Sequence, residues 1–128
     1  MMKKIGRRSL SFAILIVVCL TVTQTFAGTA TTQTGEVVET YCWAVHQVGG
    51  TGHAQCGIEC AKRGLPVALY DQKSLKAFIL LPARDKSSLP PDLIAAMGQR
   101  VTVRGEVMAR GGIQFLIVQS WQRVVAVH

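Results

Sequence analysis

Charged residues are scarce in this chain of 128 residues, at 16% of the total, whereas apolar residues make up 49%. This balance excludes a disordered polar tail and predicts a packed core. Lysine and arginine number 14 against 7 acidic residues, which gives a formal charge of +7. The length indicates one basic domain and nothing larger.

Several motifs that identify a chemistry are absent. The sequence contains no Cys-x-x-Cys-His for covalent haem, no Cys-x-x-Cys for thioredoxin-type exchange and no Gly-x-x-x-x-Gly-Lys loop for nucleotide phosphates. No third residue can be identified that would orient a histidine base beside a cysteine nucleophile. We therefore expect a protein that is not an enzyme, with a thiol redox role left open.

The N-terminal segment has the three parts of a secretory signal peptide. Residues 1–8 carry four basic side chains, and Leu10 to Val22 is an almost wholly apolar run of thirteen residues. This run is shorter than the roughly 20 residues that a membrane-crossing helix needs. It is followed by Thr25-Phe26-Ala27, a small-x-small sequence of the kind at which signal peptides are cleaved. We predict a signal peptide over 1–27 and a periplasmic or secreted protein that meets the membrane only through this peptide. An uncleaved N-terminal anchor is the alternative.

Removal of this peptide changes the charge of the chain. Four basic residues leave with it, so that residues 28–128 contain ten basic and seven acidic side chains. These charges alternate in sign and form no basic block, and we therefore expect no nucleic-acid partner.

The rest of the chain is interpreted as a flexible lead-in over 28–35 and one domain over 36–128. Thr51 is expected to cap a helix over 53–63, and Gly64 with Pro66 to end it. The predicted elements, in chain order, are a strand over 36–43, the helix over 53–63, strands over 66–70 and 75–81, a helix over 88–97, strands over 100–109 and 113–119, and a strand-like run over 123–127.

This order of elements resembles the five-stranded OB-type barrel. Val101, Val103, Gly105 and Val107 alternate with polar residues and would form the closing hairpin of such a barrel. The resemblance covers residues 34–127. It implies a small, mainly β fold of the α+β class, with the helix over 53–63 added between the first two strands. A small sandwich is the alternative. Since the OB barrel hosts many functions, the fold alone implies none of them.

Potential metal ligands are concentrated in one short segment. Cys42, Cys56 and Cys60, the cysteines that remain after cleavage, lie within nineteen consecutive residues that also hold His46 and His53. At 100° per residue, His53, Cys56 and Cys60 share one narrow face of the predicted helix. The Gly-rich loop before the helix could fold Cys42 and His46 back over that face.

Two interpretations of this cluster compete. The first is a site for a thiophilic metal ion, Cu(I) or Zn(II), with Cys42, His53, Cys56 and Cys60 as ligands and His46 as an alternate. The second is a disulfide from Cys42 to Cys56 or Cys60, in an interaction module whose barrel face contacts a periplasmic protein. Cys56 and Cys60 should not pair with each other. Residues four apart on a helix hold their Cβ atoms about 5 to 6 Å apart, whereas a disulfide requires about 3.5 to 4.5 Å.

Two further resemblances rest on this segment. Together with Cys42 and Gly49, the run from Gly52-His53 through Cys56 and Cys60 to Pro66-Val67 is similar to a group of small exported bacterial proteins. Those proteins carry a His-x-x-Cys-x-x-x-Cys helix before an OB-like body, and the similarity implies no particular activity. In size, export and expected barrel, the chain loosely resembles the periplasmic copper and silver chaperones. Their ligands are Met, His and Trp, so none of their ligand positions is carried over to this sequence.

Overall fold

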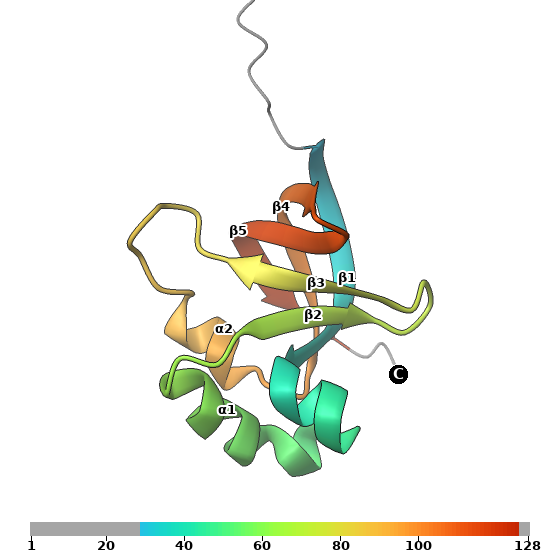
Figure 1. Ribbon diagram of the computed structural model, residues 1–128, viewed down its shortest axis with the longest axis vertical. Helices are drawn as coiled ribbons and strands as arrows, with labels where there is room; N and C mark the ends of the chain where they lie inside the picture. Colours follow the sequence, from blue (N-terminus) through green and yellow to red (C-terminus); the bar gives the residue numbers. More distant parts are fainter. Residues whose placement is uncertain (1–28, 126–128) are drawn as a thin grey trace, which may run out of the picture.

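Five strands close into a barrel in the computed structural model, which describes residues 29–125 (Figure 1). Around the barrel the order is β1-β2-β3-β5-β4, and β4 pairs again with β1. All neighbours are antiparallel except β3 and β5, which are parallel. The strands are β1 (Thr29–Glu39), β2 (Val67–Asp71), β3 (Lys76–Leu81), β4 (Arg100–Arg110) and β5 (Ile113–Arg123). The predicted OB-like, mainly β fold of the α+β class is confirmed.

Short helices connect these strands at one end of the barrel. Between β1 and β2 the chain forms a wide turn of π type, a 3₁₀ turn and a helix, whereas a single helix links β3 to β4 (Figure 1). They are η1 (Cys42–His46), η2 (Thr51–His53), α1 (Ala54–Lys62) and α2 (Pro91–Ala95). The extra helix predicted between the first two strands is therefore present. Within residues 29–125, every helix is too short or too polar to cross a membrane.

The segment with the extra helix leaves and rejoins the barrel at one point. The backbone N–H and the hydroxyl of Thr40 both donate hydrogen bonds to the carbonyl oxygen of Pro66, each over 3.0 Å. Residues 41–65, which we call the excursion, therefore project from a closed neck between β1 and β2.

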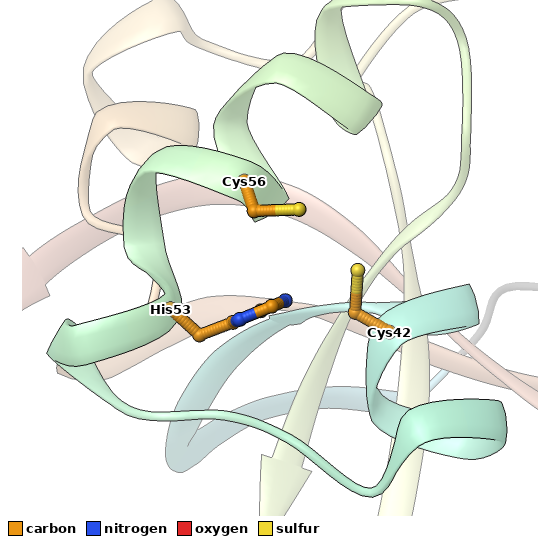
Figure 2. A group of neighbouring side chains, drawn as sticks. All are labelled: Cys42, His53 and Cys56. Atoms are coloured by element: carbon orange, nitrogen blue, oxygen red, sulfur yellow. The ribbon is translucent and has the colours of Figure 1, made fainter.

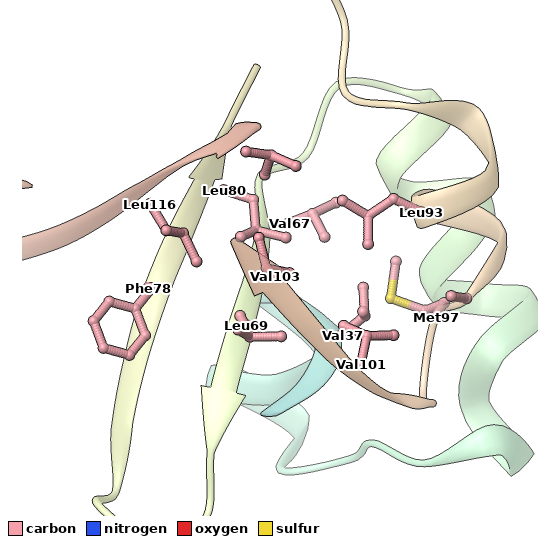
Figure 3. Packing of buried hydrophobic residues seen from close by; sticks show 12 residues of the cluster. Val37, Val67, Leu69, Phe78, Leu80, Leu93, Met97, Val101, Val103 and Leu116 are labelled. Carbon is pink, nitrogen blue, oxygen red and sulfur yellow. The ribbon is translucent and has the colours of Figure 1, made fainter. Parts of the chain in front are cut away.

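The core fills the barrel and extends under the helices. Its side chains come from every strand and from the α2 region, and Ala54, Ile58 and Ala61 of α1 pack against it. Met97 lies on the side of the core that faces α1 (Figure 3). The buried cluster comprises Val37, Val67, Leu69, Phe78, Leu80, Leu93, Ala96, Met97, Val101, Val103, Leu116 and Val118.

Two glycines allow close contacts that shape the barrel. At Gly105 the register of β4 against β5 shifts, and a Cβ atom there would lie 1.8 Å from the carbonyl oxygen of Ile117. Such a shift bends the strand and helps a small sheet to close. Gly98 has a φ of +75°, and a Cβ there would lie 2.2 Å from the carbonyl oxygen of Gly50. Glycine at position 98 therefore allows the loop before η2 to lie directly against the barrel end.

Expectations about the two ends of the described chain differ from the structure. The flexible lead-in over 28–35 is wrong from Thr29 onward, because Thr29 to Glu36 pairs with β4. Threonine favours strands, and the exposed edge of β4 supplies the partner. At the other end of the chain, β5 continues through Arg123, and Val124 and Val125 belong to no strand. The predicted signal peptide over 1–27 and the last residues of the run over 123–127 lie outside the described residues.

The strand predicted over 36–43 ends early, at Glu39. The carboxylate of Glu39 accepts the backbone N–H groups of Tyr41 and Cys42, over 2.7 and 2.9 Å, and so starts a helical turn in place of a longer strand. Thr51 does not cap the helix, since it is the first residue of η2 and Gly50 occupies the capping position. Gly64, with a φ of +97°, ends the helix as expected.

Candidate metal centre

Cys42 is fixed at the start of η1 by the buried side chain of Glu39. Glu39 is 2% exposed and Cys42 is 5% exposed. Both oxygens of the Glu39 carboxylate accept backbone N–H groups, Oε1 from Tyr41 and Oε2 from Cys42. Hydrogen bonds to an ionised acceptor are among the stronger ones in proteins. The carboxylate therefore fixes the backbone at Cys42 and, with it, the direction in which the Cys42 side chain points.

His53 ends η2 and points its ring towards the two nearest thiols. Figure 2 shows the imidazole converging with the side chains of Cys42, from η1, and Cys56, from α1. The Nε2 atom of His53 is buried and has no hydrogen-bond partner among residues 29–125. Buried polar atoms without a partner are rare and costly in native structures. This atom therefore needs an explanation in terms of what it contacts.

Cys56 and Cys60 are placed by the packing of α1. Gly57 is buried between them, and a Cβ atom there would lie 2.8 Å from Cγ and 3.1 Å from Sδ of Met97. The absence of a side chain at Gly57 thus lets α1 approach the core. This close packing leaves Cys56 exposed and Cys60 half-buried on the side that faces Cys42.

The ligand atoms form two overlapping groups that share Cys42. In the first group, Cys42, His53 and Cys56 hold their ligand atoms within 4.8 Å of one another. In the second, the same limit holds for Glu39, Cys42 and Cys60. Among the described residues neither group contains both Cys56 and Cys60. These Cys and His groups lie close enough together to hold a metal ion.

The electrostatics centre on the pair of Glu39 and Cys42. Burial acts to raise the pKa of Glu39, but the Cys42 thiol and the N–H groups of Cys42 and Tyr41 outweigh it and lower the pKa below its ordinary value. The same thiol–carboxylate hydrogen bond, together with burial and the Glu39 charge, raises the pKa of Cys42 to about 12. Burial and the neighbouring Cys56 raise the pKa of Cys60. Without a metal, Cys42 is therefore a protonated thiol at neutral pH.

The predicted ligands do not all meet. Cys42, His53 and Cys56 come together, whereas Cys60 is grouped with Cys42 and Glu39. His46 is exposed on η1, where its ring meets the edge of Tyr41 at a centroid distance of 5.5 Å, and it belongs to neither group. All three cysteines of the described chain are free thiols.

Two residues near the site were not anticipated from the sequence. Glu39 joins the second group, and Met97 lines the same small cavity as Cys42 and His53. A signal for Glu39 was present, because an acid that directly follows two apolar strand residues is a candidate for a buried, partnered carboxylate. Met97 carried no such signal, since a methionine beside a helix end is an ordinary core residue.

Comparisons with protein-family models, curated protein sequences and solved structures gave no match to this chain. The site must therefore be interpreted from its own chemistry.

Proposed function

We propose that this chain is an exported, non-enzymatic protein that binds a thiophilic metal ion, Cu(I) or Zn(II), in metal handling or as a structural centre. The ligands are Cys42, His53 and Cys56, with Cys60 as a further thiolate. The buried and unpartnered Nε2 of His53, directed at two thiols, carries this proposal. A metal ion would give that nitrogen the partner it lacks.

The chemistry and the spacing of the donors support such an ion. Thiolates and imidazole together are the donors preferred by Cu(I) and Zn(II), and they disfavour Ca²⁺ and Mg²⁺. Bonds of about 2.0 to 2.3 Å to a central ion place neighbouring donors roughly 3.5 to 4 Å apart. The donors of the first group lie within 4.8 Å of one another, so small side-chain rotations would complete the site.

Metal analysis with a free-thiol count tests this proposal on protein purified from the periplasm. We expect about one metal ion per chain, and thiols that react fully only after the metal is chelated. His53→Ala should weaken the binding of added Cu(I) or Zn(II) by about tenfold or more. The matched control is His46→Ala, which removes an exposed imidazole outside both groups. Equal affinity of the two variants would refute the site.

A disulfide-stapled interaction module is the second candidate. The sulfur atom of Cys42 lies within 4.8 Å of the sulfur atoms of both Cys56 and Cys60, so oxidation could join it to either. Such a protein would contain no metal and one free thiol per chain. Its stability would be nearly unaffected by His53→Ala, because the histidine would contribute little to the stapled fold.

Export is proposed from the sequence of residues 1–27. Mass spectrometry of the protein from the periplasmic fraction should give a chain that starts at Gly28. A full-length chain in the membrane fraction would instead indicate an uncleaved anchor.

A further inference from the structure

The three thiols of the site differ sharply in their access to solvent. Cys42 is 5% exposed, Cys60 is half-buried and Cys56 is exposed. Cys42 also belongs to both ligand groups, whereas Cys56 and Cys60 belong to one each. The site therefore has a buried ligand common to both groups and an exposed ligand at its rim.

This difference in solvent exposure among the ligands is unlike the arrangement of a structural metal centre. Structural zinc sites are closed, with four protein ligands around the ion and no route for another donor. Here an incoming donor could reach a bound ion from the side of Cys56 without unfolding the protein. The second group, with Glu39 and Cys60, offers further donors to an ion that remains bound to Cys42.

We infer that the site transfers its ion to a thiolate-bearing acceptor by ligand exchange at Cys56, while Cys42 retains the ion until the end. This inference rests on the proposed function and specifies how the bound ion leaves. The acceptor is a soft sulfur donor, because only such a donor competes with thiolate ligands for Cu(I) or Zn(II).

The exchange step is balanced without any change of oxidation state. The sulfur of the incoming thiol forms a bond to the ion as the bond between the ion and Cys56 Sγ breaks. The proton of the incoming thiol passes to Cys56, which becomes a free thiol. The bond between the ion and His53 Nε2 breaks next as a further donor of the acceptor binds, and Cys60, where it is a ligand, leaves as Cys56 does. The last exchange releases the ion from Cys42, whose sulfur takes up the proton of the incoming thiol in the same way.

The rate law of release tests this mechanism on the full chain without its signal peptide. The protein is loaded anaerobically with one equivalent of Cu(I), or of Zn(II) where Zn(II) is the ion retained. It is then mixed with increasing concentrations of glutathione, and the metal left on the protein is measured after rapid desalting. We expect the rate constant of release to rise in proportion to glutathione, doubling with each doubling of its concentration. Imidazole at the same concentrations should release far less metal.

A rate constant that does not depend on glutathione would overturn the inference, because release would then be limited by opening of a closed site. Equal release of metal by glutathione and by imidazole would overturn the proposal that the acceptor is a thiolate. A protein that retains neither ion would instead refute the proposed function itself, so the two failures can be distinguished. His46→Ala, loaded and treated in the same way, should show the wild-type rate.

The order in which the thiols become free gives an independent readout. When half of the ion has been transferred, a pulse of iodoacetamide followed by peptide mapping should find Cys56 alkylated and Cys42 still protected. For comparison, metal-free protein is labelled in the same way, to measure how exposure alone orders the reaction. Labelling of Cys42 before Cys56, or a ratio of Cys42 to Cys56 labelling no lower than that of the metal-free protein, would contradict exchange at Cys56.

Discussion

The barrel and the excursion follow different rules of stability. The barrel buries side chains such as Leu69, Val101 and Leu116 completely, and its strands pair in a nearly continuous register. The excursion instead exposes Tyr41 and Val45, holds an imidazole nitrogen without a partner and begins at a buried carboxylate. The barrel thus depends on filled volume, whereas the excursion depends, beyond the packing of one face of α1 on the core, on the polar partners of a few atoms. Four substitutions test this division, beginning with the largest expected effect.

Leu69→Ala should destabilise the protein most while leaving the site intact. Leu69 is 0% exposed, and truncation of a buried leucine costs about 2 to 5 kcal/mol of unfolding free energy. Denaturant unfolding measures this loss, and metal affinity below the transition should match the wild type. Leu75→Ala is the control, because Leu75 is 74% exposed and should change stability little. A large loss of metal affinity at full folding would show that core and site are coupled.

Glu39→Gln should destabilise the start of the excursion at Tyr41 and Cys42. The carboxylate accepts two backbone N–H groups, and an amide in its place must turn its NH₂ towards one of them, which costs about 1.5 to 3 kcal/mol. Because the pKa of Glu39 is lowered in the native protein, its stabilisation is present above the ordinary carboxyl value of 4.5 and is lost as the pH falls through the native value.

The variant should therefore show a weaker loss of stability on acidification than the wild type, as measured by denaturant unfolding from pH 7 downward. Glu59→Gln removes a carboxylate from an exposed position on α1 and serves as the control. If the two variants lose stability equally, Glu39 does not have the role described here.

Gly57→Ala should disturb both regions, because it lies at their contact. The added Cβ would meet Cγ of Met97 at 2.8 Å, and overpacking of this kind costs about 1 to 3 kcal/mol. The strain should also shift α1 and weaken metal binding through Cys56. Gly52→Ala is the matched control, since a Cβ there meets nothing within 4 Å. Unchanged stability would mean that the higher helix propensity of alanine offsets the cost of moving Met97. Unchanged affinity would contradict the expected shift of α1.

Asp71→Asn should have the smallest effect and only on the barrel. The Ser74 hydroxyl and the backbone N–H of Lys73 hydrogen-bond to the Asp71 carboxylate and lower its pKa. The small stabilisation is thus present above the ordinary value of 3.8 and disappears at lower pH. Thermal unfolding near pH 7 should show a slight decrease, and Asp85→Asn gives the comparison at another exposed turn. A change in metal binding would be unexpected.

The barrel could be predicted from the sequence because its signals are local and periodic. The alternation of Val101, Val103 and Gly105 defined β4, and polar turns separated the hairpin strands. The helix carrying Cys56 and Cys60 was also predictable, since Gly64 and Pro66 mark its end. The extension of β1 to Thr29 was not, because pairing with β4 is a long-range contact that local composition does not reveal.

The site was predictable in its residue types but not in its arrangement. Helical spacing brought His53, Cys56 and Cys60 onto one face, and the Gly-rich loop suggested how Cys42 could join them. The division into two groups depends on the early end of β1 at Glu39 and on the wide turn η1. A helical turn of this kind follows from a buried carboxylate binding nearby N–H groups, which no periodicity of the sequence records. The same turn places His46 away from Cys42.

The neck between Thr40 and Pro66 has a consequence for protein engineering. Because both ends of the excursion meet at one carbonyl oxygen, its two ends are separated by little more than the spacing of adjacent strands. A short hairpin turn could therefore replace residues 41–65, and the ligand-bearing segment could be grafted between paired strands of an unrelated barrel. In the graft, a buried carboxylate at the position of Glu39 and a surface that accommodates α1 as Met97 does here would be the main requirements.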